Sequence, residues 1–565
     1  MFVYRLLRQY SMEVLSKDVF SSLPVPEQLG QLRAVDSKTR QELILSARNS
    51  FTLVRSLSPE MLFYTVKDIG LADAVGLVAL AAPEQVRDMI DLDCWRKDHL
   101  DDRRLIAWLL LLDESGSGKL AQWALQADIE LLVLLVRRHF EIVRKAEIEE
   151  DIHFDQSLYF TFDDQYLLRF IGEEEPILHL LLERLRVLDY RMFTYILENS
   201  LVELESSLEE GAFRWRTARL ADRAYPDYEE AQELFSPIAL DTIRLERFRR
   251  APLRRLRFAE GEDLIPSDHA LMLLDVSHSL FVHALRAVPV EEIELIGLEL
   301  AVLTNKAAIA EGVDLGELSE VHRCVEIVHD YVNIGLAFLA QENEDQATQF
   351  LRGTMLHPFF QVGRTLVLQL GQEAKRLTRT LQRGSLEHWE SLLDSPFRET
   401  FTGVQRKQPL FFRGLEVPGE ILYRRFQALS DIDRVAHVLE QIPVWFTVMQ
   451  HWKLLPDRHV PEGMTLATLW NTAFVHWALD RQVNPQPLQR KDLIRVQKRL
   501  SREKLETSLA VFVSLLVAEC RFPDTQVAEV QALAEFACEK LQEVLAMDVA
   551  TVPLRFVTGL HMVAE

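Results

Sequence analysis

Cysteine is scarce in this sequence, and its placement argues against two classes of stabilised fold. The 565-residue chain has four cysteines, which are Cys94, Cys324, Cys520 and Cys538. No two of them form a CxxC pair, so the spacing predicts neither a disulfide framework nor a zinc site built on cysteine. We expect reduced and mostly buried thiols.

Long hydrophobic runs are also missing. The longest apolar stretches, such as residues 105–112 and 131–136, are far shorter than the roughly 20 residues that a membrane-spanning helix needs. Residues 1–10 lack the apolar core and the small-residue cleavage site of a signal peptide. Both observations predict a soluble protein that stays in the cytoplasm.

Positive charge is in deficit, because the formal net charge is -23 at pH 7. An acidic chain repels phosphates, so we expect no general nucleic-acid binding. Hydrophobic residues make up 48% and charged residues 26%, which is typical of a globular protein. The length allows two to four domains, on a usual domain size of roughly 100–200 residues.

Catalytic and cofactor-binding motifs are absent as well. The chain has no GxSxG, no HExxH, and no GxGxxG after a predicted strand. The sequence therefore favours a non-enzymatic protein and predicts no cofactor.

What the sequence does contain is a series of short helices over residues 51–150, each with its own start signal. Ser58 can cap the first helix, with Pro59 in its first turn and Gly70 at its end. Pro83 and Glu84 repeat the same start. Apolar residues recur at helical spacing: Met61, Leu62, Val66 and Ile69; Leu71, Val75 and Val78; Val86, Met89 and Ile90; Leu105, Ile106, Leu109 and Leu112. Helices this short must stack on one another to be stable, as in an array of right-angled helical repeats.

We therefore predict an all-α fold with four parts: an N-terminal helical segment at 1–50, the array at 51–150, a third part at 151–258, and a helical region at 259–565. The third part includes a β-hairpin formed by residues 158–162 and 166–170, because both stretches are rich in aromatic residues. In the last part, a helix over 291–311 ends at Gly312 and packs on a helix over 316–341, with Gly335 in its apolar seam.

Several motifs carry a resemblance to known families. The helix starts at Ser58-Pro59-Glu60 and at residues 82–86 resemble the helical repeats in the cytosolic N-terminal domain of MgtE-type magnesium transporters. Residues 219–231, 298–314 and 330–339 resemble signatures of an uncharacterised bacterial family of large, soluble, helical proteins. The first resemblance covers the array alone, without a membrane domain. The second implies a fold class for most of the chain but no activity.

Two helical pairs suggest a metal site in the C-terminal half. Asp275 with His278, and Glu326 with His329, are three residues apart, which places a carboxylate and an imidazole on one helix face. Carboxylate-bridged di-metal bundles use such pairs together with two further glutamates, and Glu294 or Glu299 could serve. The alternative is that these histidines lie at the edge of the core with ordinary hydrogen-bond partners.

Residues 244–257 concentrate arginine in this acidic chain. The seven arginines are Arg244, Arg247, Arg249, Arg250, Arg254, Arg255 and Arg257. In one interpretation they pair with the protein's own carboxylates and join its two halves. In the other, Arg249, Arg250, Arg254 and Arg255 form an exposed strip that binds an anionic partner such as nucleic acid or lipid headgroups.

These features support three hypotheses. The first is a cytosolic, non-enzymatic scaffold or regulatory protein that binds a partner protein through its helical array. The second is a metal-binding bundle or enzyme in the C-terminal half, which uses Asp275, His278, Glu326 and His329. The third is an anion-binding protein that uses the arginine-rich segment.

The arginine-rich segment gives the first testable prediction. Changing Arg249, Arg250, Arg254 and Arg255 to Gln lowers the thermal stability, because internal ion pairs are lost. The unmutated protein shows no salt-sensitive binding to DNA, RNA or anionic vesicles in a titration at low and at physiological salt. Micromolar, salt-dependent binding to any of these would contradict internal pairing and favour the anionic-partner hypothesis.

Overall fold

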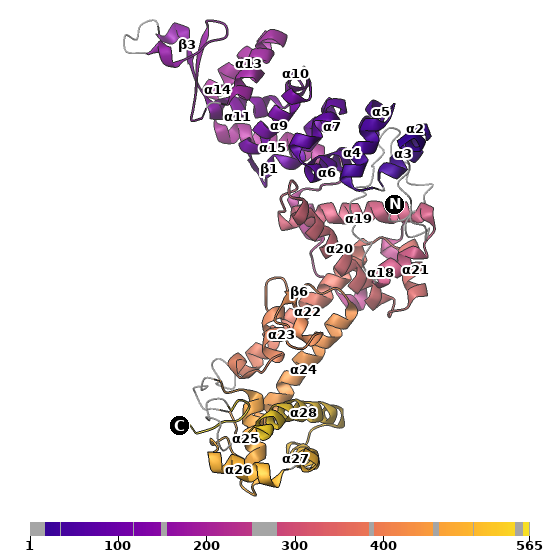
Figure 1. Cartoon of the computed structure of the whole chain (residues 1–565), viewed down its shortest axis with the longest axis vertical. Helices are drawn as coiled ribbons and strands as arrows, with labels where there is room; N and C mark the ends of the chain where they lie inside the picture. Colours follow the sequence, from indigo (N-terminus) through magenta and orange to yellow (C-terminus); the bar gives the residue numbers. More distant parts are fainter. Residues whose placement is uncertain are drawn as a thin grey trace. The chain divides into compact units, whose positions relative to one another are not determined.

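A computed structural model describes residues 17–563, except 34, 117, 149–154, 174, 244, 251–278, 383–388, 456–462, 501 and 548–556. The described residues form 26 α-helices and only short strands, which confirms the all-α prediction (Figure 1). The chain divides into two compact units, Met1–Gly363 and Arg364–Glu565. The boundary predicted near residue 258 falls within the first unit, in a stretch outside the described residues.

The first unit begins with ten short helices: α2 (Lys17–Ser22), α3 (Val25–Leu32), α4 (Ser37–Ser46), α5 (Ser50–Ser56), α6 (Pro59–Ile69), α7 (Val75–Leu80), α8 (Pro83–Asp93), α9 (Asp102–Glu114), α10 (Lys119–Ala124) and α11 (Ile129–His139). The predicted start of α6 is confirmed, because the Ser58 hydroxyl accepts a hydrogen bond from the Met61 amide at 3.2 Å. Gly70, with a φ of 93°, ends that helix as predicted.

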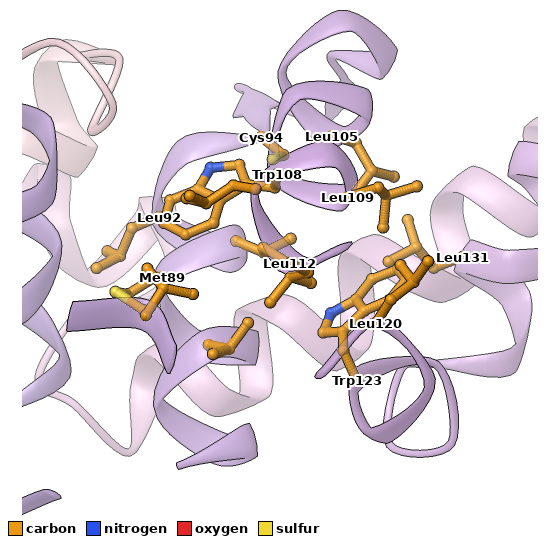
Figure 2. Packing of buried hydrophobic residues seen from close by; sticks show 14 of the residues in the cluster. Met89, Leu92, Cys94, Leu105, Trp108, Leu109, Leu112, Leu120, Trp123 and Leu131 are labelled. Atoms are coloured by element: carbon orange, nitrogen blue, oxygen red, sulfur yellow. The ribbon is translucent and has the colours of Figure 1, made fainter. Parts of the chain in front are cut away.

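The helices of the array share one apolar core. Figure 2 shows how α8, α9, α10 and α11 contribute to it through Met89, Leu92, Trp108, Leu109, Leu112, Leu120, Trp123 and Leu131. Most of the predicted core positions are buried, among them Val86 and Ile106. Ile69, Leu71 and Val75 are only partly buried, because they flank the turn at Gly70.

The predicted β-hairpin is partly wrong. Residues 166–170 do form a strand, β4 (Tyr166–Phe170), but it pairs antiparallel with β3 (Phe140–Arg144), which follows α11 directly. Residues 158–162 contribute a single bridge between Phe160 and Leu168. Alternate burial along β3 stabilises it as a strand, since Phe140 and Ile142 face the core. The other two-stranded sheets pair β1 (Trp95–Arg96) with β2 (His99–Leu100), and β5 (Phe411–Phe412) with β6 (Tyr423–Arg424).

The rest of the first unit is helical. It contains α12 (Lys145–Ile148), α13 (Pro176–Leu188), α14 (Tyr190–Val202), α15 (Glu205–Ala221), α16 (Tyr228–Glu233), α18 (Leu280–Arg286), α19 (Val290–Glu311), α20 (Leu318–Leu339) and α21 (Glu344–Gly353). The two long helices predicted for the second half are α19 and α20, which pack on each other. Gly312, with a φ of 65°, ends α19 in a left-handed conformation.

The second unit contains α23 (Phe397–Val404), α24 (Leu429–His451), α25 (Leu466–Ala478), α26 (Arg490–Arg499), α27 (Arg502–Cys520) and α28 (Asp524–Ala546). Its core includes the fully buried indoles of Trp389, Trp445 and Trp470. The boundary between the units falls within α22 (His357–Gln382). All four cysteines are free, and three of them are buried. Among the described residues, no helix is long and apolar enough to cross a membrane.

Two glycines let α20 and the start of α22 approach closely. A Cβ atom on Gly335 would lie 1.9 Å from the Phe359 carbonyl oxygen, and one on Gly363 would lie 2.0 Å from the Tyr331 carbonyl oxygen. Such contacts are impossible, and backbone cannot move aside as a flexible side chain can. Gly335 is therefore required by packing rather than by its own φ and ψ angles.

We predict that Gly335→Ala lowers the midpoint of thermal unfolding, measured by circular dichroism. The two helices must separate to admit the methyl group, at a cost of about 3 kcal/mol or more. Gly30→Ala is the control, because a Cβ atom at Gly30 in α3 meets nothing within 4 Å. That change should leave the midpoint equal or slightly higher. If Gly335→Ala were as stable as the control, the close packing of α20 on α22 would be wrong.

Candidate functional site

Helix α8 carries three buried aspartates in the middle of the first unit. The exposed fractions of Asp88, Asp91 and Asp93 are 3%, 4% and 1%. Aspartate is rarely buried to this extent unless its charge is paired, because removing an ionised carboxylate from water is unfavourable by several kcal/mol. Each of the three carboxylates indeed meets a cation.

Asp91 is held by Arg219 of α15. The Nε and Nη2 atoms of Arg219 donate to the two carboxylate oxygens of Asp91 at 2.6 and 3.0 Å. The Nη1 and Nη2 atoms also donate to Asp128, just before α11, at 2.8 and 2.7 Å. One turn earlier, Arg216 Nε donates to the backbone carbonyl of Asp91 at 2.7 Å. Because carbonyls in the last turn of a helix lack partners within the helix, Arg216 also caps α8.

Asp88 is paired with Arg223, in the turn that follows the end of α15. Arg223 Nη2 donates to the Asp88 carboxylate, and Arg223 Nη1 donates to Glu60 of α6 at 3.3 Å. Tyr64 and Tyr225 are hydrogen-bonded to each other beside this group, and burial raises the pKa of both phenols. The segment from Arg219 to Tyr225, which is the first half of one family signature, thus connects α15 to both α6 and α8.

Asp93 connects α8 to the segment between α19 and α20. Its carboxylate accepts hydrogen bonds from Trp108 Nε1 at 2.8 Å and from Lys67 Nζ at 2.9 Å. Arg104 Nη1 donates to the Asp93 backbone carbonyl at 2.8 Å and to Asp314 at 2.9 Å. Asp314 is the last residue of the family signature over residues 298–314. Through Arg104, this second signature is therefore also connected to α8.

We refer to these groups as the arginine–aspartate network, which consists of Glu60, Asp88, Asp91, Asp93, Arg104, Arg216, Arg219 and Arg223. Burial raises the pKa of Glu60 and of Asp91, although the neighbouring arginines act in the opposite direction. Burial also lowers the pKa of Arg216 to about 10. Because the carboxylates are already engaged by cations, the network suits a structural role, in which it fixes α15 and the loop after α19 on α8.

The opposite side of α15 is open. A groove of about 310 Å³ lies where α11, α14 and α15 meet, and both α14 and α15 pack on α11. We call it the α14–α15 groove. Its polar and aromatic lining includes Glu130, Tyr195, Asn199, Glu203, Glu210 and Arg214. Gly211 brings the backbone of α15 close to α11, since a Cβ atom there would lie 3.1 Å from Glu130 Cγ.

Specific polar contacts fix the walls of the groove. Arg137 of α11 donates to the Ser200 carbonyl near the end of α14 at 2.6 Å. The neighbouring Arg138 donates to Glu205 and Glu209 in the first turns of α15 at 2.6 and 3.0 Å. The groove is therefore formed by helices that are already held in place.

The structure describes only half of the residues predicted for a metal site. Asp275 and His278 lie outside the described residues, as does the side chain of Glu294. Glu326 and His329 are one turn apart on α20, where Glu326 is exposed and His329 Nε2 lies 3.0 Å from the Ser279 hydroxyl. No group of three or more His, Cys, Asp or Glu side chains that could hold a metal occurs among the described residues. The metal hypothesis stays a prediction.

Two of the four predicted anion-binding arginines are described. Arg249 is exposed, whereas Arg250 is paired within the first unit. Its Nε and Nη2 atoms donate to Glu299 of α19 at 2.7 and 3.0 Å, and Nη2 also donates to the Thr354 carbonyl at 3.2 Å. Arg254 and Arg255 lie outside the described residues. Arg250 therefore pairs with a carboxylate of the protein itself, whereas the joining of two halves by these arginines stays a prediction.

Sequence reasoning identified neither the network nor the groove. Arg216 lies just before the signature at 219–231, and Arg219 and Arg223 lie within it. Their spacing of three and four residues is the signal that could have suggested one buried cationic face. No sequence pattern marks Tyr195 and Trp215 as exposed. Apolar residues at helical spacing are more often part of the core, so the sequence alone favours burial.

The network predicts a pH-dependent effect of losing Arg219. In Arg219→Met the Asp91 carboxylate stays buried without its main partner, so we expect a loss of about 3–5 kcal/mol near neutral pH. Burial already raises the pKa of Asp91, and losing Arg219 raises it further. A raised carboxyl pKa favours the protonated folded state, so the penalty should shrink as the pH falls from about 8 to about 5.

The measurement is thermal unfolding of the variant and the wild type across that pH range. Arg214→Met on the same helix is the control, because the ion pair between Arg214 and Glu210 is exposed and contributes little. Equal losses in the two variants, or a loss for Arg219→Met that does not change with pH, would contradict a buried network.

Comparison with known proteins extends this description to the whole chain. Residues 17–562 match the family described as a family of unknown function, DUF6178. No curated protein and no solved structure matches the chain. The match includes both units, the network and the groove. It agrees with the resemblance of residues 219–231, 298–314 and 330–339 to one helical family over most of the chain. The chain therefore belongs to the family of unknown function DUF6178.

Proposed function

We propose that the protein is a cytoplasmic, non-enzymatic helical scaffold that binds a partner protein through the α14–α15 groove. The observation that carries this proposal is the groove itself, which combines a concave surface with an exposed aromatic side chain, since Tyr195 is 53% exposed. Aromatic side chains are typical of protein interfaces, where they bury a large area for little conformational entropy.

Exposed apolar side chains that neighbour lining residues in the sequence support the proposal. Leu204 follows the lining residue Glu203, and Trp215 follows Arg214; they are 67% and 55% exposed. Val202, at the end of α14, is 73% exposed. Single exposed apolar residues are normal, but several in the segments that line one groove support a binding surface there.

The resemblance of residues 51–150 to the N-terminal domain of MgtE-type transporters fits a scaffold, because stacked helical repeats commonly bind other proteins. It remains a proposal, as does the bacterial origin implied by the family signatures. The metal-binding and anion-binding alternatives have no contact in the described residues that favours them.

The proposal can be tested by affinity purification of the tagged full chain from its native host, followed by mass spectrometry. We expect at least one protein that co-purifies with the wild type to be lost from the double variant Tyr195→Ala/Trp215→Ala. Removing the two aromatic groups should weaken binding by about 2 kcal/mol or more if they are central to the interface.

The matched control is Phe51→Ala/Tyr228→Ala, which removes two exposed aromatic groups elsewhere in the first unit. Circular dichroism verifies that both variants fold. If the wild type and both variants retain the same proteins, the groove is not the docking surface and the proposal is wrong.

A further inference from the structure

The charges of the α14–α15 groove define the chemistry of its occupant. Glu130 and Glu203 line the groove, and neither forms an ion pair within the described part of the chain. The third lining carboxylate, Glu210, pairs with Arg214 one turn away on α15. The groove therefore presents two carboxylates with free acceptor capacity toward a bound partner.

This excess of negative charge in the groove contrasts with the paired charges where α15 faces α8. Facing α8, the carboxylates Asp88 and Asp91 are matched by Arg223 and Arg219. Among the described residues, the carboxylates of α8 that face α15 and the turn after it are thus neutralised, whereas Glu130 and Glu203 have no ion-pair partner. Charge complementarity points to a cationic ligand.

The aromatic lining of the groove further restricts the class of cationic ligand. Tyr195 lies in the groove and is half exposed, so its ring can pack against a guanidinium or an alkylammonium group. Cations prefer the faces of aromatic rings, and carboxylates bind the guanidinium group with paired hydrogen bonds. The lining also includes the partly buried Ile129, so the ligand needs an apolar surface as well.

We infer that the occupant is a basic amphipathic helix of a partner protein, with arginine or lysine side chains that bind Glu130 and Glu203 and an apolar face that covers Tyr195 and Ile129. An amphipathic helix suits a groove between two helices, because its anchor residues recur at helical spacing. The inference rests on the proposed function and names the class of partner that the groove selects.

The test uses two fluorescein-labelled synthetic helical peptides with the same leucine face, one flanked by arginines and the other by glutamates. Fluorescence anisotropy measures their binding to the full-length chain. We expect the arginine peptide alone to bind, with an affinity that decreases as salt is added. Glu130→Gln/Glu203→Gln should weaken binding at least about tenfold, and Tyr195→Ala should weaken it while Tyr195→Phe retains it.

Glu27→Gln/Glu229→Gln is the matched control. It removes the same total charge from exposed positions in α3 and α16, and we expect it to leave binding unchanged. Equal weakening in both double variants would show that the peptide senses only the net charge of the chain, which would overturn the inference. It would also be overturned if the arginine peptide did not bind, or if the glutamate peptide bound equally well.

The same variants separate this inference from the proposed function. If a natural partner is lost from Tyr195→Ala/Trp215→Ala but retained by Glu130→Gln/Glu203→Gln, the groove is a docking surface for a partner that is not basic. The inference then fails while the proposed function stands. If the natural partner is retained by both variants, the proposed function fails on its own evidence.

Discussion

The pairing of buried carboxylates on α8 is the constraint on which the arrangement of the first unit depends. Asp88, Asp91 and Asp93 are removed from water, so cations must come to them from elsewhere in the chain. Arg219 of α15 and Arg223, in the turn just after α15, lie more than 100 residues later in the chain. Arg104 extends the network to Asp314, in the segment after α19. The position of α15 is therefore set by where its arginines must lie, and the opposite face of α15 is left to form the α14–α15 groove.

Buried ion pairs contribute little net stability, because the attraction between the charges is offset by the loss of their hydration. Their value here is specificity of arrangement. An apolar face of α15 could rotate or slide on the array with little penalty, whereas paired hydrogen bonds from one guanidinium to two carboxylates fix both the register and the rotation of the helix. A groove whose walls are fixed in this way loses little conformational entropy when a partner binds.

Features that depend on neighbouring residues could be predicted from the sequence. Ser58 and Gly70 bound α6 as expected, Gly312 ends α19, and most apolar residues at helical spacing are buried. The predicted partner strand of β4 was wrong. The true partner, β3, directly follows the apolar helix α11, and no turn residue between them marks the start of a strand in the sequence. The network was not predicted because its partners are distant in sequence, so no local pattern relates Asp91 to Arg219. The groove depends on which apolar side chains stay exposed, and helical spacing alone does not determine this.

Hydrogen–deuterium exchange of the double variant Asp88→Asn/Asp91→Asn, compared with the wild type, tests most directly whether the network holds α15 in place. Asparagine keeps the size of each side chain and removes its charge, so Arg219 of α15 and Arg223 just after it lose their ionic partners on α8. Amides of α15 should then exchange faster, while amides of α28 in the second unit should be unchanged. Exchange in α15 at the wild-type rate would contradict the claim that the buried aspartates position this helix.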